Sequence, residues 1–134
     1  MAVEHLSPDV LPSAGPPHIS IATGSKTVYF SGQVGVLADG SPAGETLRAQ
    51  LAQALRNLDA VAIAVGVGPH DFARTTIYVK DLRPELMDEL YEAVNDYIEG
   101  GGRFGGFTAS TLVGVAALYE PWCLVEIDAV AVVD

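Results

Sequence analysis

Residues 123–133 read CLVEIDAVAVV, and this stretch decides the fold because it has the composition of a buried β-strand yet carries two carboxylates. Alternate side chains of a strand lie on the same face of a sheet. One face therefore carries both carboxylates, and the other is wholly apolar: Val125, Ile127, Ala129 and Ala131. The apolar face is expected to pack against helices.

The two carboxylates, Glu126 and Asp128, need an explanation of their own. Burying an unpaired carboxylate costs several kcal/mol or raises its pKa. Glu126 is therefore expected to face a cleft, an interface or a hydrogen-bond donor of a partner. A solvated carboxylate on an open sheet face is about equally frequent, and for Asp128 we prefer that simpler interpretation.

Composition limits the class of protein. A chain of 134 residues fits one domain, spanning 1–134, and its 49% hydrophobic content suggests surplus apolar surface for an oligomer interface. Its formal net charge of −10 repels a phosphate backbone, so we expect no nucleic-acid partner. The single cysteine, Cys123, cannot form an internal disulfide, and no Cys or His pair has zinc-site spacing.

Targeting and cofactor motifs are not found. The first 17 residues lack the basic and apolar regions of a signal peptide, and no apolar run reaches membrane-spanning length. A cytoplasmic protein without a membrane partner is expected. The glycine-rich passage at 100–106 lacks the GxxxxGK[ST] order, and no serine lies in GxSxG. We therefore expect no cofactor and no serine nucleophile of that kind.

The secondary-structure pattern predicts an α+β fold. Residues 1–14 are expected to be a loose arm because Pro8 and Pro12 interrupt regular structure. Leucine spacing predicts one helix over 47–61, and a second apolar stripe predicts another over 86–97. Alternation, β-branched residues and glycine turns predict the strands, which are 18–22, 26–31, 34–37, 74–80, 110–118 and 123–133.

The resulting order is β-β-β-α-β-α-β-β. Two helices separated by one strand, with a hairpin at each end of the chain, predict a single mixed sheet with both helices on one face. The first hairpin is expected to turn at Gly24. The other face of the sheet is then left for further subunits.

Several short motifs, in this order, resemble those of the Rid (YjgF-like) proteins, small trimeric enzymes and binders named for reactive-intermediate deamination. They are Ser31-Gly32-Gln33, the first helix from Ala49-Gln50 to Leu58, RTTIYVKDL at 74–82, Tyr91-Glu92-Ala93, and EIDAVAV at 126–132. The resemblance runs from Gly15 to the end of the chain. It implies a chorismate-mutase-like homotrimer with small-molecule sites in the clefts between adjacent subunits.

The resemblance also implies site residues. Ser31 and Gly32 match the pair that lines the cleft, and Glu126 matches the carboxylate that positions the hydrolytic water. His18 falls near an aromatic position of the first strand, and Asp88 falls at an asparagine-type position. These five residues are an expected catalytic and substrate-binding set, in which His18 and Asp88 match the family positions less closely than the other three.

This chain departs from the deaminating members of the family at Ser110, where they carry an arginine that binds the substrate carboxylate. A hydroxyl does not replace a bidentate arginine. Ser110 and Leu112 are still expected to line the cleft. Arg103, upstream in the glycine-rich passage, is the one basic residue predicted to fold over it, although a solvated loop arginine is about twice as frequent. Losing the arginine costs on the order of 2 to 4 kcal/mol of substrate binding.

Three functions follow from the resemblance. The first is hydrolysis of reactive imines or enamines with altered specificity, with Glu126 as the base. The second is non-catalytic binding of small metabolites such as 2-oxo acids in the same cleft. The third, the endoribonuclease activity sometimes ascribed to the family, fits poorly with the charge of −10.

Overall fold

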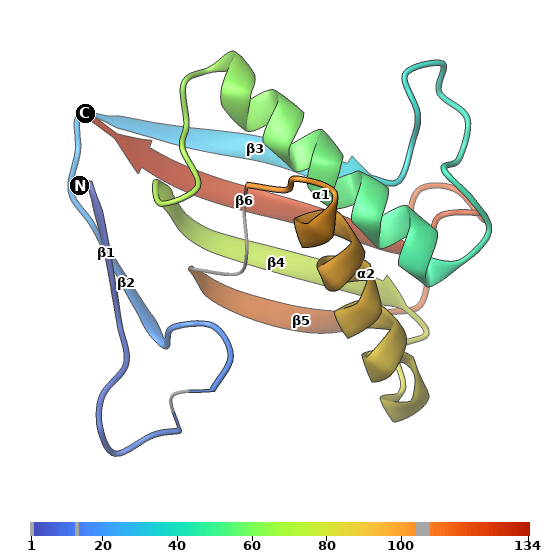
Figure 1. The fold of residues 1–134 in the computed structure, drawn as a ribbon, viewed down its shortest axis with the longest axis horizontal. Coiled ribbons are helices and arrows are strands. Elements are labelled where there is room, and N and C mark those ends of the chain that lie inside the picture. The colour runs from blue at the N-terminus through green and yellow to red at the C-terminus, as the bar shows by residue number, and fades with distance from the viewer. Residues whose placement is uncertain (1, 13, 104–107) are drawn as a thin grey trace.

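The computed structural model describes residues 2–12, 14–103 and 108–134 (Figure 1). The chain follows the predicted α+β class. Its elements, in order, are β1 (Val3–Leu6), β2 (Ile19–Ala22), β3 (Lys26–Val34), α1 (Leu47–Ala64), β4 (Phe72–Lys80), a 3₁₀ turn η1 (Pro84–Leu86), α2 (Met87–Glu99), β5 (Ala109–Val115) and β6 (Val125–Val133).

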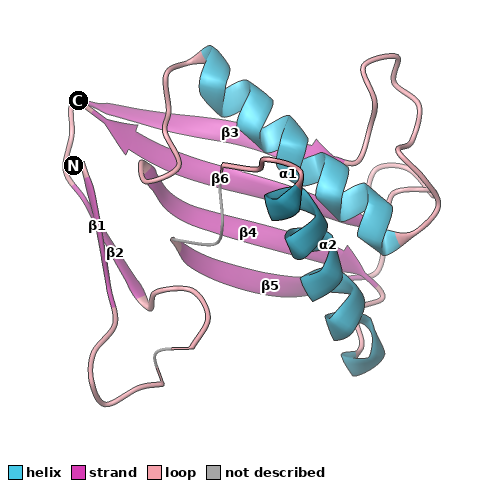
Figure 2. Ribbon diagram, viewed as in Figure 1, coloured by secondary structure: helices cyan, strands magenta, loops and turns pink. Residues whose placement is uncertain are grey.

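The main sheet is mixed and has four strands in the order β3-β6-β4-β5. β6 runs antiparallel to both of its neighbours, and β4 and β5 are parallel. The parallel pair is connected through α2, because parallel strands need a long crossover. Both helices cover the same face of this sheet, as the alternation in β6 predicted (Figure 2).

The core lies between that face and the helices. The predicted apolar face of β6 is buried, with Val125, Ile127 and Ala131 fully inaccessible to solvent. The helices contribute the predicted apolar stripes, which contain Leu47, Leu51, Leu55, Leu58, Leu90, Ala93 and Tyr97. The other face of β6 is only half-buried along most of its length.

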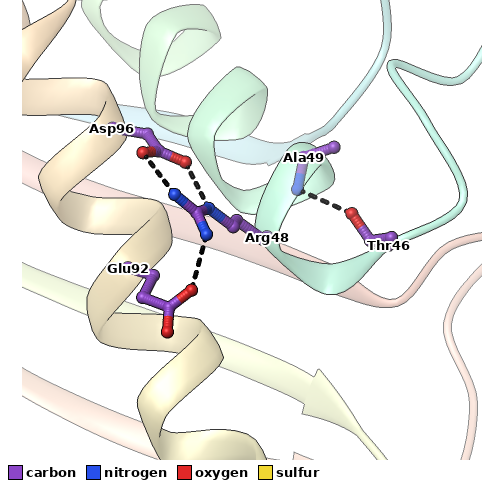
Figure 3. Close-up of polar contacts among 5 residues, drawn as sticks. All are labelled: Thr46, Arg48, Ala49, Glu92 and Asp96. Carbon is purple, nitrogen blue, oxygen red and sulfur yellow. Dashed lines mark hydrogen bonds and ion pairs between the residues drawn. The ribbon is translucent and has the colours of Figure 1, made fainter.

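α1 begins and ends where its sequence directs. The Thr46 side chain accepts a hydrogen bond from the Ala49 N–H at 3.1 Å, which caps the first turn. The helix ends before Gly66, which has φ +74°, a conformation that glycine adopts readily. Near its start, Arg48 contacts both Glu92 and Asp96 of α2 at 2.6 Å, so a forked guanidinium joins the two helices (Figure 3).

The N-terminal arm differs from the expectation of a loose segment. Residues 3–6 form β1, which pairs antiparallel with β2 in a separate two-stranded sheet. The predicted hairpin of residues 18–22 with β3 is therefore wrong, and so is the expectation of a single sheet. The apolar Val3 is fully buried and packs against Val132 of β6, so a contact with the far end of the chain holds the arm despite its prolines.

The predicted hairpin between the last two strands is also wrong. β6 does not pair with β5, because β4 lies between them. Residues 34–37 do not form a strand of their own either. β3 continues to Val34 through an irregularity between Phe30 and Gln33, and Val36 makes only an isolated bridge to Pro42.

Candidate functional site

Glu126 lies on the face of the main sheet away from the helices. Tyr78 of β4 lies directly opposite it, and Thr76 lies opposite Asp128. The Tyr78 hydroxyl donates a hydrogen bond of 3.0 Å to Asp128 Oδ2. Glu126, Asp128 and Tyr78 therefore form one polar group on this face, which we call the carboxylate face.

Gly32 meets the Glu126 carboxylate across the irregular part of β3. A Cβ at position 32 would lie 2.5 Å from Glu126 Cδ and closer still to Oε2. Only a residue without a side chain allows the carboxylate to lie there. Ser31 precedes Gly32 in β3 and is exposed, so of the three residues that match the family motif best, Gly32 and Glu126 lie against each other and Ser31 is the residue next to them in the strand.

The surroundings of Glu126 change its acidity. Burial raises the pKa of this carboxyl above its usual range, and the nearby negative charge of Asp128 raises it further. The hydrogen bond to Asp128 in turn raises the pKa of the Tyr78 hydroxyl. A carboxylate with a raised pKa is a stronger proton acceptor, which suits a general base.

A groove of about 910 Å³ lies on the opposite face of the sheet, between the helices and the N-terminal arm. Its floor carries Ser110 and Leu112 of β5, whose partners on β4 are Thr75 and Ile77. Those partners pair in turn with core residues of β6. α2 contributes Met87, Leu90, Tyr91 and Val94, and the arm contributes His5, Leu6, Ser7, Gly15, Pro16 and Pro17.

Ser110, which stands at the family's arginine position, is hydrogen-bonded within the chain. Its Oγ donates to the Thr108 carbonyl at 3.0 Å and lies 2.6 Å from Thr75 Oγ1. Because the single Ser110 hydroxyl proton is used on Thr108, Thr75 is the donor of the second bond. Both hydroxyls are thus occupied by protein partners.

Three other predicted residues lie outside the groove in a single chain. His18 is exposed, and its Nε2 bonds the Pro12 carbonyl at 2.8 Å. Asp88 follows Met87 in the first turn of α2, but its side chain does not line the groove. Arg103 is exposed, and its backbone N–H donates to Asp59 Oδ2 at 3.1 Å. Part of the glycine-rich passage, residues 104–107, lies outside the described residues.

Five of the predicted residues therefore fall into two sets on opposite faces of one sheet. Glu126, Gly32 and Ser31 belong to the carboxylate face, whereas Ser110 and Leu112 belong to the groove. A single sheet separates the two sets. One chain cannot bring them onto the same small molecule.

Sequence reasoning missed the contribution of the arm to the groove. His5 lines it, and the Nε2 of His5 lies 2.9 Å from the Phe72 carbonyl at the start of β4. No local pattern around residues 3–7 indicates this, because β1 is positioned by contacts with residues far away in the sequence. Among the described residues, no group of three or more His, Cys, Asp or Glu could hold a metal ion.

Known proteins match nearly the whole chain. A family model described as Endoribonuclease L-PSP matches residues 12–133. A Salmonella typhimurium 2-iminobutanoate/2-iminopropanoate deaminase is 32% identical over 122 residues, which cover 90% of this chain and 91% of the deaminase. The chain belongs to the Rid (YjgF-like) family.

Proteins of known structure share its fold. YyfB of Yersinia pestis, described as a Rid-family protein of unknown function, has 29% identity and a TM-score of 0.85, covering 98% of this chain and 99% of its own. A Vibrio vulnificus protein described as a putative translation initiation inhibitor has 29% identity and a TM-score of 0.66, covering 96% and 98%. This Rid protein has no helix, within the ranges that the structure describes, that is long and apolar enough to cross a bilayer.

Proposed function

We propose that this Rid protein hydrolyses reactive imines or enamines in a site formed by two copies of the chain. One copy supplies the carboxylate face with Glu126, Gly32 and Ser31, and the next supplies the groove with Ser110 and Leu112. The observation that carries the proposal is the position of these two sets on opposite faces of one sheet. The Salmonella relative supports the reaction class, since its name gives two imino acids as substrates.

The chemistry needs only water and a base. Glu126 accepts a proton from water as the water oxygen bonds to the carbon of the C=N group. Glu126 returns this proton to the nitrogen, which gives a carbinolamine. The hydroxyl proton of the carbinolamine then passes to the nitrogen, the C–N bond breaks, and ammonia leaves as the C=O bond of the product forms. The raised pKa of Glu126 suits both steps, because the same carboxyl first takes a proton and then returns it.

The assembly that fits is a closed ring. A contact between two different faces of the same chain is heterologous, and such contacts are closed only by rotational symmetry. Rid proteins are generally homotrimers that bind small molecules, so we propose three copies and three sites. Light scattering at micromolar concentration checks the number of copies, and a monomer would contradict the two-copy site.

Mixing two inactive variants tests the proposal directly. Glu126→Gln removes the base, and Leu112→Trp fills the groove from an edge-strand position that is 38% exposed. Each variant alone should lack activity on a freshly generated imine. Co-expressed, they should recover about a quarter of the sites, those that join an intact carboxylate face to an intact groove.

Two results would overturn the proposal. If the mixture stays inactive while each variant folds and assembles like wild type, the two faces do not share a site. If wild type itself does not accelerate imine hydrolysis but binds ligands, the second candidate holds, which is non-catalytic binding of small metabolites. The observation that supports this second candidate is that Ser110 forms hydrogen bonds within the chain and has no charge with which to hold a charged substrate.

A further inference from the structure

We infer that the groove binds an uncharged ligand with an apolar side group, such as a branched aliphatic or aromatic chain beside a C=N or C=O group. The inference rests on the proposed function, because it names the substrate class of the same site. It sets this chain apart from its Salmonella relative, whose named substrates are imino acids and carry a carboxylate.

The lining of the groove is poor in charge. Among the described residues, no Lys, Arg, Asp or Glu side chain lines it. The wall is mostly aliphatic and aromatic, and its ionisable groups are the imidazoles of His5 and His70 and the Tyr91 phenol. A carboxylate buried in such a groove would lose its hydration without gaining a guanidinium or ammonium partner.

The polar groups on the floor of the groove are hydrogen-bonded to each other and to the backbone. A carboxylate needs hydrogen-bond donors, but the Ser110 proton is used on the Thr108 carbonyl and the Thr75 proton on Ser110. To bind an anion, these hydroxyls would have to break bonds of 3.0 Å and 2.6 Å within the chain. The hydroxyl groups of the floor therefore already have hydrogen-bond partners within the chain. What the floor offers a ligand is apolar contact.

The charged side chains near the groove do not favour an anionic ligand. Arg48 is held by Glu92 and Asp96. Arg74 does not line the groove and belongs to the carboxylate face, but its side chain donates at 2.7 Å to Oγ1 of Thr111, which lies at the edge of the groove. A second copy that closes the groove with its carboxylate face would bring Glu126 and Asp128 together with Arg74, so its negative charge exceeds its positive charge and opposes an anionic ligand.

The size of the groove fits a small molecule with a sizeable side group. Its volume of about 910 Å³ lies at the upper end of the range typical of small-molecule sites. Leu51, Leu55, Ile77, Leu90 and Val94 give it apolar surface on three sides, from both helices and from β4. A side group larger than methyl or ethyl would bury more of that surface.

A matched pair of ligands tests the inference. 4-Phenyl-2-butanone and 4-phenyl-2-oxobutanoate have the same phenylethyl group and the same ketone, and differ by a methyl group against a carboxylate. Calorimetric titration of the wild-type assembly should show the ketone binding about tenfold more tightly or better. The Ser110→Arg variant should reverse this preference, because it places a guanidinium on the groove floor.

Three controls keep the result interpretable. Circular dichroism and denaturation establish whether Ser110→Arg folds, and Leu112→Arg at the more exposed neighbouring position is the second variant if it does not. Arg56→Gln, at an exposed position of α1 where the side chain bonds Gln53 and does not line the groove, should leave both affinities unchanged. The imine of the same ketone, generated in place by an amine oxidase, measures turnover against Glu126→Gln.

The outcomes separate the inference from the proposed function. Tighter binding of the oxo acid than of the ketone by wild type would overturn the inference. Binding of neither ligand would also overturn it. Binding of the ketone without turnover of its imine would uphold the inference and contradict the proposed hydrolysis.

Discussion

Replacing Gly32 by alanine tests the link between the bend in β3 and the base. Gly32 does not have a positive φ, so alanine is compatible with the backbone. The new Cβ would lie 2.5 Å from Glu126 Cδ, whereas ordinary contact begins at 3.4 Å. The carboxylate must therefore move by about 1 Å, because it is the flexible partner.

The size of the effect follows from that displacement. Misplacing a reacting group by about 1 Å costs on the order of 100-fold in rate, equivalent to about 2.7 kcal/mol in the activation free energy. Stability should change less, by about 1 kcal/mol, since the side chain can rotate away at the cost of an imperfect rotamer. Gly32→Ala should thus lose activity while it stays folded.

The assay combines turnover with a readout that does not depend on it. Imine hydrolysis is compared between wild type, Gly32→Ala and Gly68→Ala, the last being a glycine that also lies near a carboxylate, with Asp71 Oδ2 3.3 Å from the added Cβ. Carbon NMR of the Glu126 carboxyl should show an altered pKa only in Gly32→Ala. A double-mutant cycle with Glu126→Ala should remove the stability cost of the added methyl group.

The reasoning is refuted if Gly32→Ala retains wild-type turnover and an unchanged Glu126 pKa. Equal losses of activity in Gly32→Ala and Gly68→Ala would refute it too, because the second variant leaves the Glu126 carboxylate where it is.

Three further predictions concern stability. Gln50 is buried and bonds the Gly44 and Trp122 carbonyls and the Leu124 N–H, so Gln50→Leu should lower the free energy of unfolding by about 3 kcal/mol in urea titrations, and Gln53→Leu by much less. Glu126→Gln should raise the melting temperature at neutral pH, because burial raises the pKa of Glu126 and its ionised form weakens the fold; this gain should vanish as the pH falls below the ordinary glutamate value of 4.5. Arg48→Met should lower the melting temperature by separating α1 from α2, and a loss that does not shrink in high salt would contradict an ionic origin.

The sequence predicted correctly which face of a strand is buried, but not which strands pair with each other. Alternation in β6 correctly predicted which face of the strand packs under the helices, because burial follows the period of the strand. The partner of a strand is decided by contacts distant in sequence. β2 pairs with β1 and β6 with β3 and β4, where short connections had predicted the hairpins β2-β3 and β5-β6.

The same limit applies to the site. An acidic residue in an apolar strand and a glycine in β3 could be predicted to meet, and Gly32 does lie against the Glu126 carboxylate. The separation of Glu126 from Ser110 could not be predicted, because it depends on the register between β4, β5 and β6. The position of His5 in the lining of the groove could not be predicted either, because it depends on the packing of Val3 against Val132.

The position of β6 has a consequence for how the chain folds during synthesis. β6 leaves the ribosome after β3, β4 and β5, yet it lies between β3 and β4 in the middle of the main sheet. Until it emerges, β3 has no neighbour in that sheet, and the leucines of both helices face an incomplete floor. Folding must then be a late and largely single event, and nascent chains that stall before residue 125 should expose apolar helix faces that chaperones bind.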